Sequence, residues 1–309
     1  MRGLNLEYYI GYTYLHDMKG IVLAGGSGTR LYPLTISNSK QMLPVYDKPM
    51  VYYPIATLMT VGIRDILIIS TPNDVGNFVR LLGDGTDFGV SLTYAVQPSP
   101  GGLAQAFLIA RDFINGQPCA MVLGDNIFYG DGFGALLKQA MADAKEGKAT
   151  VFGLEVSDPQ RFGVVEFDEI GNVVSIIEKP KEPRSNYAVT GLYFYPGDVC
   201  ENASTLKPSA RGELEITDLN NIYLKEKRLK VQLLKNGFRW WDTGTFDSLM
   251  GAAKYVQDLT LHHGRSICSP EAIAYAEGWI TKETLQKSAE KYSKNSYGEY
   301  LKSLLGRSA

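Results

Sequence analysis

The chain has 309 residues, of which 45% are hydrophobic and 21% charged, as is ordinary for a globular protein with a full core. The formal net charge of −2 gives no overall attraction to nucleic acid or to an anionic membrane, so an anionic ligand must be met by local cations. Three scattered cysteines, Cys119, Cys200 and Cys268, are too few for a disulfide framework or a zinc site and favour a reducing cytoplasm. No apolar run reaches the length of a membrane span.

Residues 1–17 are expected to be an N-terminal extension that precedes a core beginning at Met18. The segment is rich in tyrosine and is interrupted by Glu7 and His16. It lacks both the uninterrupted apolar stretch and the small-residue cleavage site of a signal peptide. An added strand is the alternative interpretation.

Strands and helices are predicted to alternate in the first half of the chain. Continuous apolar runs predict buried strands, and apolar residues at helical spacing predict helices. We expect strands at 21–23, 66–70, 92–96 and 120–123, and helices at 49–61, 75–82 and 103–113. This alternation predicts an α/β fold, a Rossmann-like, mainly parallel open sheet whose ligands bind at the carboxyl ends of its strands.

The pattern changes after Thr150, where hairpin-like strands replace the alternation. We expect strands at 151–156, 162–167, 173–178, 188–195 and 229–234. A helix at 217–227 is predicted, with Thr217 as its N-cap. We interpret residues 151–216 as a lobe inserted into a core that spans residues 18–245.

From Phe246 onwards the chain is predicted to be mostly helical. We expect helices at 246–262, 270–276 and 281–291. Residues 246–309 are therefore interpreted as a C-terminal helical region that packs for stability or for oligomer contacts.

A glycine-rich loop, Gly25-Gly26-Ser27-Gly28, follows the first strand. Without a Cβ, such a backbone can turn sharply and press its N–H groups against a phosphate chain. Arg30 and Lys40 supply cations close by. The dinucleotide fingerprint fails because Leu31 stands where a third glycine is needed, and no Gly-Lys-Ser/Thr closes a P-loop. The loop predicts phosphate binding, with a turn that needs glycine only for packing as the alternative.

Four motifs together resemble the sugar-nucleotide pyrophosphorylases. They are Leu-Ala-Gly-Gly-Ser-Gly-Thr-Arg-Leu at 23–31, Ser-Lys-Gln-Met-Leu-Pro at 39–44, Tyr-Tyr-Pro at 52–54 and Gly-Asp-Asn-Ile-Phe-Tyr-Gly at 124–130. The resemblance runs from Met18 to about Leu305. It implies that Mg²⁺ is required and that dTMP passes from dTTP to glucose 1-phosphate, the first step towards dTDP-rhamnose. It also implies a homotetramer with feedback by dTDP-rhamnose at a second site involving the C-terminal helices.

Two aspartates match the metal ligands of that family. Asp125 follows the apolar strand 120–123, and Asp242 lies in Trp-Asp-Thr-Gly-Thr at 241–245. Two carboxylates suffice for Mg²⁺, which keeps several waters and takes further oxygens from phosphate. Taken alone, Asp125 is equally consistent with a helix cap or a turn carboxylate, and for Asp242 alone the turn interpretation is favoured. Asp125, Arg30, Lys40 and Lys179 are the expected catalytic residues.

The nucleotide site implied by the resemblance contains the glycine loop, Arg30, Lys40 and three further positions. Gln41 follows Lys40, while Gln97 and Gly102 match the part that reads the base. The amide of Gln97 offers a donor and an acceptor, which suits the N3–H and carbonyl edge of a pyrimidine. Relatives often carry an acidic residue where Gly101 stands. A residue at the surface end of a strand is the alternative for Gln97.

The sugar-phosphate site implied by the resemblance lies in the inserted lobe and the segment after it. Glu178 can accept from sugar hydroxyls, while Lys179 and Arg211 can meet the phosphate. Gly163 and Val189 match positions where main chain meets the sugar. Taken alone, Glu-Lys-Pro at 178–180 is typical of a solvated loop, and Gly163 and Val189 are consistent with simple packing.

No general base is predicted, because none of the three histidines is well placed and no Ser/His/Asp or Cys/His set can be assembled. A phosphate oxygen is already ionised, so direct in-line displacement fits this absence. The nearest alternative is a pyrophosphorylase that uses UTP, CTP or ATP, or another sugar phosphate. A non-catalytic nucleotide-sugar-binding regulator and a nicotinamide oxidoreductase are the alternatives from other classes.

Overall fold

The computed structural model describes residues 18–235, 237–264 and 266–306. The expected extension at 1–17 and the last three residues of the C-terminal region lie outside the described residues. Within those described ranges, no helix is both long enough and apolar enough to cross a membrane.

Four parallel strands form the centre of the sheet, in the order β6-β1-β4-β5. Their bounds are Lys19–Ala24 for β1, Asp65–Ser70 for β4, Ser91–Val96 for β5 and Cys119–Leu123 for β6. Each of the four lies where an apolar run predicts a strand. Their carboxyl ends lie at one edge of the sheet, which is where ligands bind in such folds.

The rest of the sheet is largely antiparallel and extends it beyond β6 in the order β10-β9-β11-β6. Its strands are β8 (Ala149–Glu155), β9 (Gly163–Phe167), β10 (Val173–Glu178), β11 (Tyr187–Tyr195) and β12 (Leu229–Leu234). Strand β8 pairs with β11, and β12 runs parallel to β8. The predicted α/β fold with a mainly parallel central sheet is confirmed.

Two short pairs of strands stand apart from the main sheet. They are β2 (Pro44–Val45) with β3 (Lys48–Pro49), and β7 (Asn126–Tyr129) with β13 (Arg239–Asp242). The β7–β13 pair brings together two segments that are more than a hundred residues apart in the sequence, and it carries the two Asp-containing motifs.

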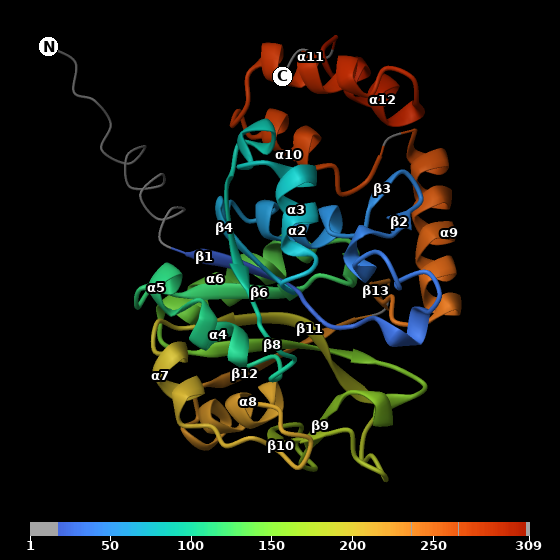
Figure 1. The fold of residues 1–309 in the computed structure, drawn as a ribbon. Coiled ribbons are helices and arrows are strands. Elements are labelled where there is room, and N and C mark those ends of the chain that lie inside the picture. The colour runs from blue at the N-terminus through green and yellow to red at the C-terminus, as the bar shows by residue number, and fades with distance from the viewer. Residues whose placement is uncertain (1–17, 236, 265, 307–309) are drawn as a thin grey trace, which may run out of the picture.

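Helices cover both faces of the sheet. They are α2 (Tyr52–Met59), α3 (Val75–Leu82), α4 (Gln105–Ile109), α5 (Arg111–Ile114), α6 (Phe133–Lys145), α7 (Val199–Ser204), α8 (Ile216–Lys225), α9 (Phe246–His263), α10 (Pro270–Ala276), α11 (Lys282–Lys291) and α12 (Ser296–Leu304). Figure 1 shows α10, α11 and α12 gathered at the end of the molecule opposite the β9–β10 hairpin.

Alternation along β1 divides the core into two layers. Val22 packs in a cluster with residues of α2, α3, α6 and the C-terminal helices, whereas Ile21 and Leu23 pack in a second cluster with α4, α5, α7 and α8. A smaller cluster joins β2, α2 and α9. Because a parallel sheet is covered on both faces, its strands are apolar throughout.

The structure corrects two predictions and adds two helices. The helix expected at 103–113 is two short helices, α4 and α5, with a break at Ala110. Helices α6 and α12 were not predicted. Thr217 is not the N-cap of α8, and its hydroxyl donates to Glu178 Oε2 at 2.6 Å. The N-cap is Glu215, whose carboxylate accepts from Ser209 and Arg211 instead of capping the helix.

Candidate active site

The glycine loop leaves the carboxyl end of β1 and turns into a short 3-10 helix at Thr29–Leu31. Gly26 has φ +94°, a conformation that favours glycine, and the space where a Cβ would stand is open. The loop is braced from behind: Thr35 donates to the carbonyl of Gly28 at 2.7 Å, and the buried Gln41 side chain donates to that of Gly25 at 3.3 Å. Gln41, a predicted nucleotide-binding residue, therefore supports the loop and also lines the pocket beside it.

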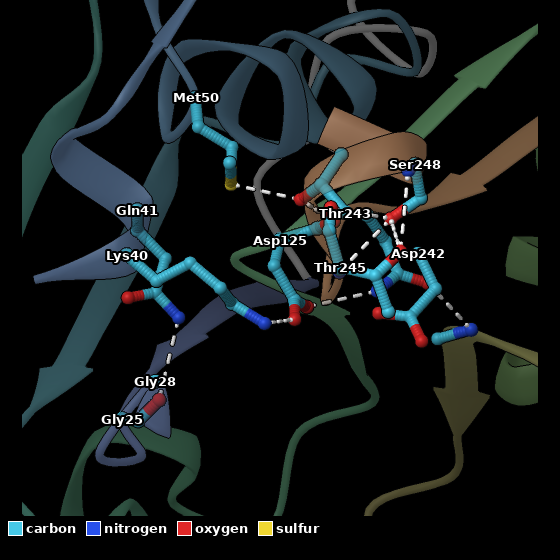
Figure 2. Close-up of polar contacts among 12 residues, drawn as sticks. Gly25, Gly28, Lys40, Gln41, Met50, Asp125, Asp242, Thr243, Thr245 and Ser248 are labelled. Carbon is cyan, nitrogen blue, oxygen red and sulfur yellow. Dashed lines mark hydrogen bonds and ion pairs between the residues drawn. The ribbon is translucent and has the colours of Figure 1, made fainter. Parts of the chain in front are cut away.

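Asp125 sits just beyond β6 and pairs with Lys40 (Figure 2). Its other carboxylate oxygen accepts from Asn126 Nδ2 at 2.9 Å. Burial raises the pKa of Asp125, but the charge and the hydrogen bond of Lys40 outweigh it, so that the pKa lies below its ordinary value. Asp125 is therefore held as a carboxylate close to the glycine loop.

Asp242 is brought to Asp125 by strand pairing, since it lies opposite Asn126 in the β7–β13 ladder. Burial, and then the negative charge of Asp125, raise the pKa of Asp242 above its ordinary value. Arg161 Nη2 lies 3.8 Å from Asp242 Oδ2, and a Cβ on Gly244 would meet both the Arg30 guanidinium and Asp242. Three cations of the chain thus surround this pair of carboxylates by contact or charge: Arg30, Lys40 and Arg161.

The two aspartates supply the hard oxygen ligands that Mg²⁺ prefers. Among the described residues, no group of three or more His, Cys, Asp or Glu side chains is arranged to hold a metal ion. A divalent cation at Asp125 and Asp242 would therefore need further oxygens from water or phosphate. That donor set fits Mg²⁺, which commonly binds through one or two carboxylates plus substrate phosphates.

A small pocket of about 200 Å³ opens beside the glycine loop and is lined by Gly25, Gln97 and Gly102. Gln97 Nε2 donates to Gln105 Oε1 at 2.8 Å, and Gln97 Oε1 faces Gly25. At Gly102, φ is +96° and a Cβ would lie 2.3 Å from the carbonyl of Leu214, so glycine is required there. The amide of Gln97 is thus fixed at the wall of this pocket.

A larger cleft of about 720 Å³ adjoins this pocket and shares Gly26 and Asp125 with it. The predicted sugar-phosphate residues line it together: Gly163, Glu178, Lys179, Val189 and Arg211. Arg30 and Asp242 line it as well.

A network of ion pairs joins these residues. Arg211 Nη2 lies 2.8 Å from Glu215 Oε2 and 3.6 Å from Glu178 Oε1, and Lys179 Nζ lies 3.4 Å from Glu178 Oε1. Hydrogen bonding to Glu215 raises the pKa of Arg211 although burial opposes it, so Arg211 stays cationic. Lys179 has φ +44°, a strained conformation for a residue with a Cβ, and its N–H donates to the carbonyl of Phe162 at 2.9 Å.

Several residues that shape the site were not predicted. Asn126 accepts from Gly191 N at 3.1 Å and from Trp240 Nε1 at 2.5 Å while it donates to Asp125. Arg161, Gln105 and Thr243 act through contacts made only in the folded chain. Asn126 could have been predicted as a site residue from the sequence, because it follows Asp125 directly in the motif at 124–130.

Comparison with known proteins defines the class. The model of the nucleotidyl transferase family matches residues 19–258, and the chain belongs to that family. It is 58% identical over 291 residues to the glucose-1-phosphate thymidylyltransferase of Neisseria gonorrhoeae, covering 94% of this chain and all of the relative. It is 57% identical over 291 residues to the enzyme of the same name from Xanthomonas campestris pv. campestris strain B100, covering 94% and 98%.

Solved structures agree with this class. A Bacillus anthracis protein described as a glucose-1-phosphate thymidylyltransferase, in complex with a sucrose, matches with TM-score 0.72 and 44% identity over 78% of this chain and 96% of its own. A UDP-glucose pyrophosphorylase complexed with UDP-glucose matches with TM-score 0.68 and 25% identity, covering 78% and 98%. Nucleotidyltransferases of this kind typically use a divalent metal.

Proposed function

We propose that this chain is a glucose-1-phosphate thymidylyltransferase, which converts dTTP and α-D-glucose 1-phosphate into dTDP-glucose and pyrophosphate. The chain belongs to the nucleotidyl transferase family, and one structural observation is the main support for the proposal. Asp125 and Asp242, whose side chains are 15% and 19% exposed, meet beside a glycine loop and at the junction of a small pocket and a charged cleft. Relatives that share more than half of their residues with this chain bear the name of this enzyme.

The reaction joins two polyanions, so the residues act mainly by positioning and by neutralising charge. Arg30, Lys40 and the backbone of the glycine loop hold the triphosphate. Lys179 and Arg211 hold the sugar phosphate so that its oxygen faces the α-phosphorus. A bond forms between that oxygen and the α-phosphorus, while the bond from the α-phosphorus to the bridging oxygen of pyrophosphate breaks. The attacking oxygen is already ionised, so no residue is needed to remove a proton.

Asp125 and Asp242 would hold the divalent cation, which we take to be Mg²⁺ because the donor set consists of carboxylate oxygens. When bound, such a cation would supply positive charge to the phosphate oxygens. Lys40 keeps Asp125 ionised and ready for this role.

Selection of substrates rests on the two cavities. Gln97, fixed by Gln105, offers its amide to the N3–H and carbonyl edge of thymine, and Gly102 adds its backbone N–H. Glu178 accepts from glucose hydroxyls, with Gly163 and Val189 against the ring. Uracil presents the same edge as thymine, so UTP is the triphosphate most able to compete.

We further propose that residues 18–245 form the catalytic core, with the sugar-binding lobe at 151–216 and supporting helices from 246 to the end. All three cysteines are free, which favours a cytoplasmic location. A homotetramer with dTDP-rhamnose feedback stays a prediction.

A competition experiment tests the assignment. Labelled glucose 1-phosphate is offered with Mg²⁺ and equal concentrations of dTTP and UTP, and the nucleotide sugars are separated by chromatography. The proposal predicts that dTDP-glucose is the main product. Predominant UDP-glucose would overturn the thymidylyl assignment while leaving the family unchanged.

A further inference from the structure

Each of the two candidate metal ligands already faces a cation supplied by the chain itself. Lys40 pairs with Asp125, and the two side chains are only 10% and 15% exposed. Arg161 Nη2 lies 3.8 Å from Asp242 Oδ2. Both cations therefore stand on the oxygens that a divalent metal would use.

Arg161 has a second anchor that lets it release Asp242 at little cost. Its Nη1 lies 2.7 Å from Asp158 Oδ2, and the guanidinium stacks over the Phe162 ring at 5.2 Å. The contact to Asp242 is the longer of its two ion pairs. Since Arg161 also lines the larger cleft, an incoming phosphate can take the place of Asp242.

Lys40 is likewise close to where a substrate phosphate would bind, beside the glycine loop. It belongs to the 3-10 helix Lys40–Met42 and lines a cavity that reaches Gly26 of the glycine loop. A phosphate chain lying on that loop would compete with Asp125 for the Lys40 ammonium, because both are anions within reach of one flexible side chain.

We propose that Lys40 and Arg161 are built-in counter-cations, which neutralise Asp125 and Asp242 in the free protein and pass to substrate phosphates when these bind. The exchange frees both carboxylates at the moment when phosphate oxygens complete the oxygen shell of a divalent cation. Metal binding is thereby coupled to nucleotide binding, and the coupling is reciprocal. This inference rests on the proposed function, since it takes the phosphates from those substrates.

The test measures Mn²⁺ binding to the nucleotide-free protein, using the electron paramagnetic resonance signal of free Mn²⁺. Lys40→Met removes the charge but keeps the length of the side chain. We expect it to bind Mn²⁺ about tenfold tighter than the wild type, as a coupling of ordinary size would give. Arg161→Gln should shift the affinity in the same direction by a smaller factor, because its contact with Asp242 is longer.

Two variants serve as controls. Lys179→Met removes a cleft cation that pairs with Glu178 rather than with either aspartate, and it should change Mn²⁺ affinity less than about twofold. Lys40→Arg keeps the charge and should bind Mn²⁺ as weakly as the wild type. Thermal melting checks that every variant is folded, and Arg161→Gln decides the matter if Lys40→Met does not fold.

The proposal is overturned if neither Lys40→Met nor Arg161→Gln tightens Mn²⁺ binding, or if Lys179→Met tightens it equally. The latter result would mean a general effect of charge. Because nucleotide is absent, these outcomes do not depend on turnover. Failure of the wild type to make dTDP-glucose would instead reject the proposed function.

Discussion

Thr243 joins the two aspartates of the site through the main chain. Its hydroxyl donates to the carbonyl oxygen of Asp125 at 2.8 Å, and its N–H donates to the same oxygen at 3.2 Å (Figure 2). Thr243 is fully buried and follows Asp242 directly. The position of one carboxylate is therefore tied to that of the other.

Thr243→Val should destabilise the protein by about 1 kcal/mol and lower kcat. The valine keeps the shape of the side chain but removes the hydroxyl donor, while the backbone N–H still satisfies the Asp125 carbonyl, so the loss is near that of one hydrogen bond. Chemical denaturation and steady-state kinetics measure the two effects. The same change at the exposed Thr93 of β5 is the control, and equal effects at both positions would contradict the role of this contact.

Asn126→Asp should lower kcat by about 10- to 100-fold and destabilise the protein at neutral pH, because Asn126 is buried beside Asp125. The new carboxylate still accepts from Gly191 and Trp240, but it can no longer donate to Asp125 and places a second negative charge beside it. This raises the pKa of Asp125, so the acid limb of kcat/KM should move to higher pH. Asn186→Asp on an exposed loop is the matched control, and a pH profile that does not move would count against the role given to Asn126.

Asp242→Asn should abolish activity and yet leave the melting temperature unchanged or higher. The pKa of Asp242 is raised, first by burial and then by Asp125, so the folded state favours its protonated form. The resulting stability is present below the ordinary pKa and is lost as pH rises through the raised pKa. Asparagine resembles the protonated form at every pH.

The stability difference between Asp242→Asn and the wild type should accordingly grow as pH rises, as followed by denaturation without metal. A mutant that is less stable than the wild type at neutral pH would show that the buried charge is compensated by its cations.

Glu178→Gln should raise KM for glucose 1-phosphate by about tenfold and leave KM for dTTP nearly unchanged. Glutamine keeps an acceptor for Thr217, but it loses the negative charge that strengthens hydrogen bonds from sugar hydroxyls. Initial rates with each substrate varied in turn measure both constants. Glu182→Gln in the exposed loop is the control; a rise confined to KM for dTTP would place Glu178 outside the sugar site.

The fold could be predicted largely from local patterns. The central strands are continuous apolar runs, and α3 and α10 have the predicted bounds. Other features depend on tertiary contacts. The helix expected at 103–113 breaks at Ala110 into α4 and α5, and the Thr217 hydroxyl donates to Glu178 instead of capping its own helix. Helix α6 had a readable pattern, since Leu137, Ala140, Met141 and Ala144 lie on one buried face.

The residues of the candidate site also fall into those that local sequence predicts and those that depend on tertiary contacts. Residues inside linear motifs, such as Arg30, Lys40 and Asp125, could be predicted because a motif is visible in one stretch of sequence. The contacts of Thr243 with Asp125 and of Arg161 with Asp242 could not, because strand pairing and loop packing bring these distant residues together.

The most direct test of the account measures pyrophosphate release from Mg²⁺, glucose 1-phosphate and each of dTTP, UTP, CTP, ATP and GTP. The wild type is compared with Asp125→Asn, which keeps the size of the side chain but removes the charge paired with Lys40. We predict that dTTP gives the fastest release and that the variant loses at least about a hundredfold in rate. Binding of dTDP-glucose without pyrophosphate release from any triphosphate would contradict the account and indicate a binding protein.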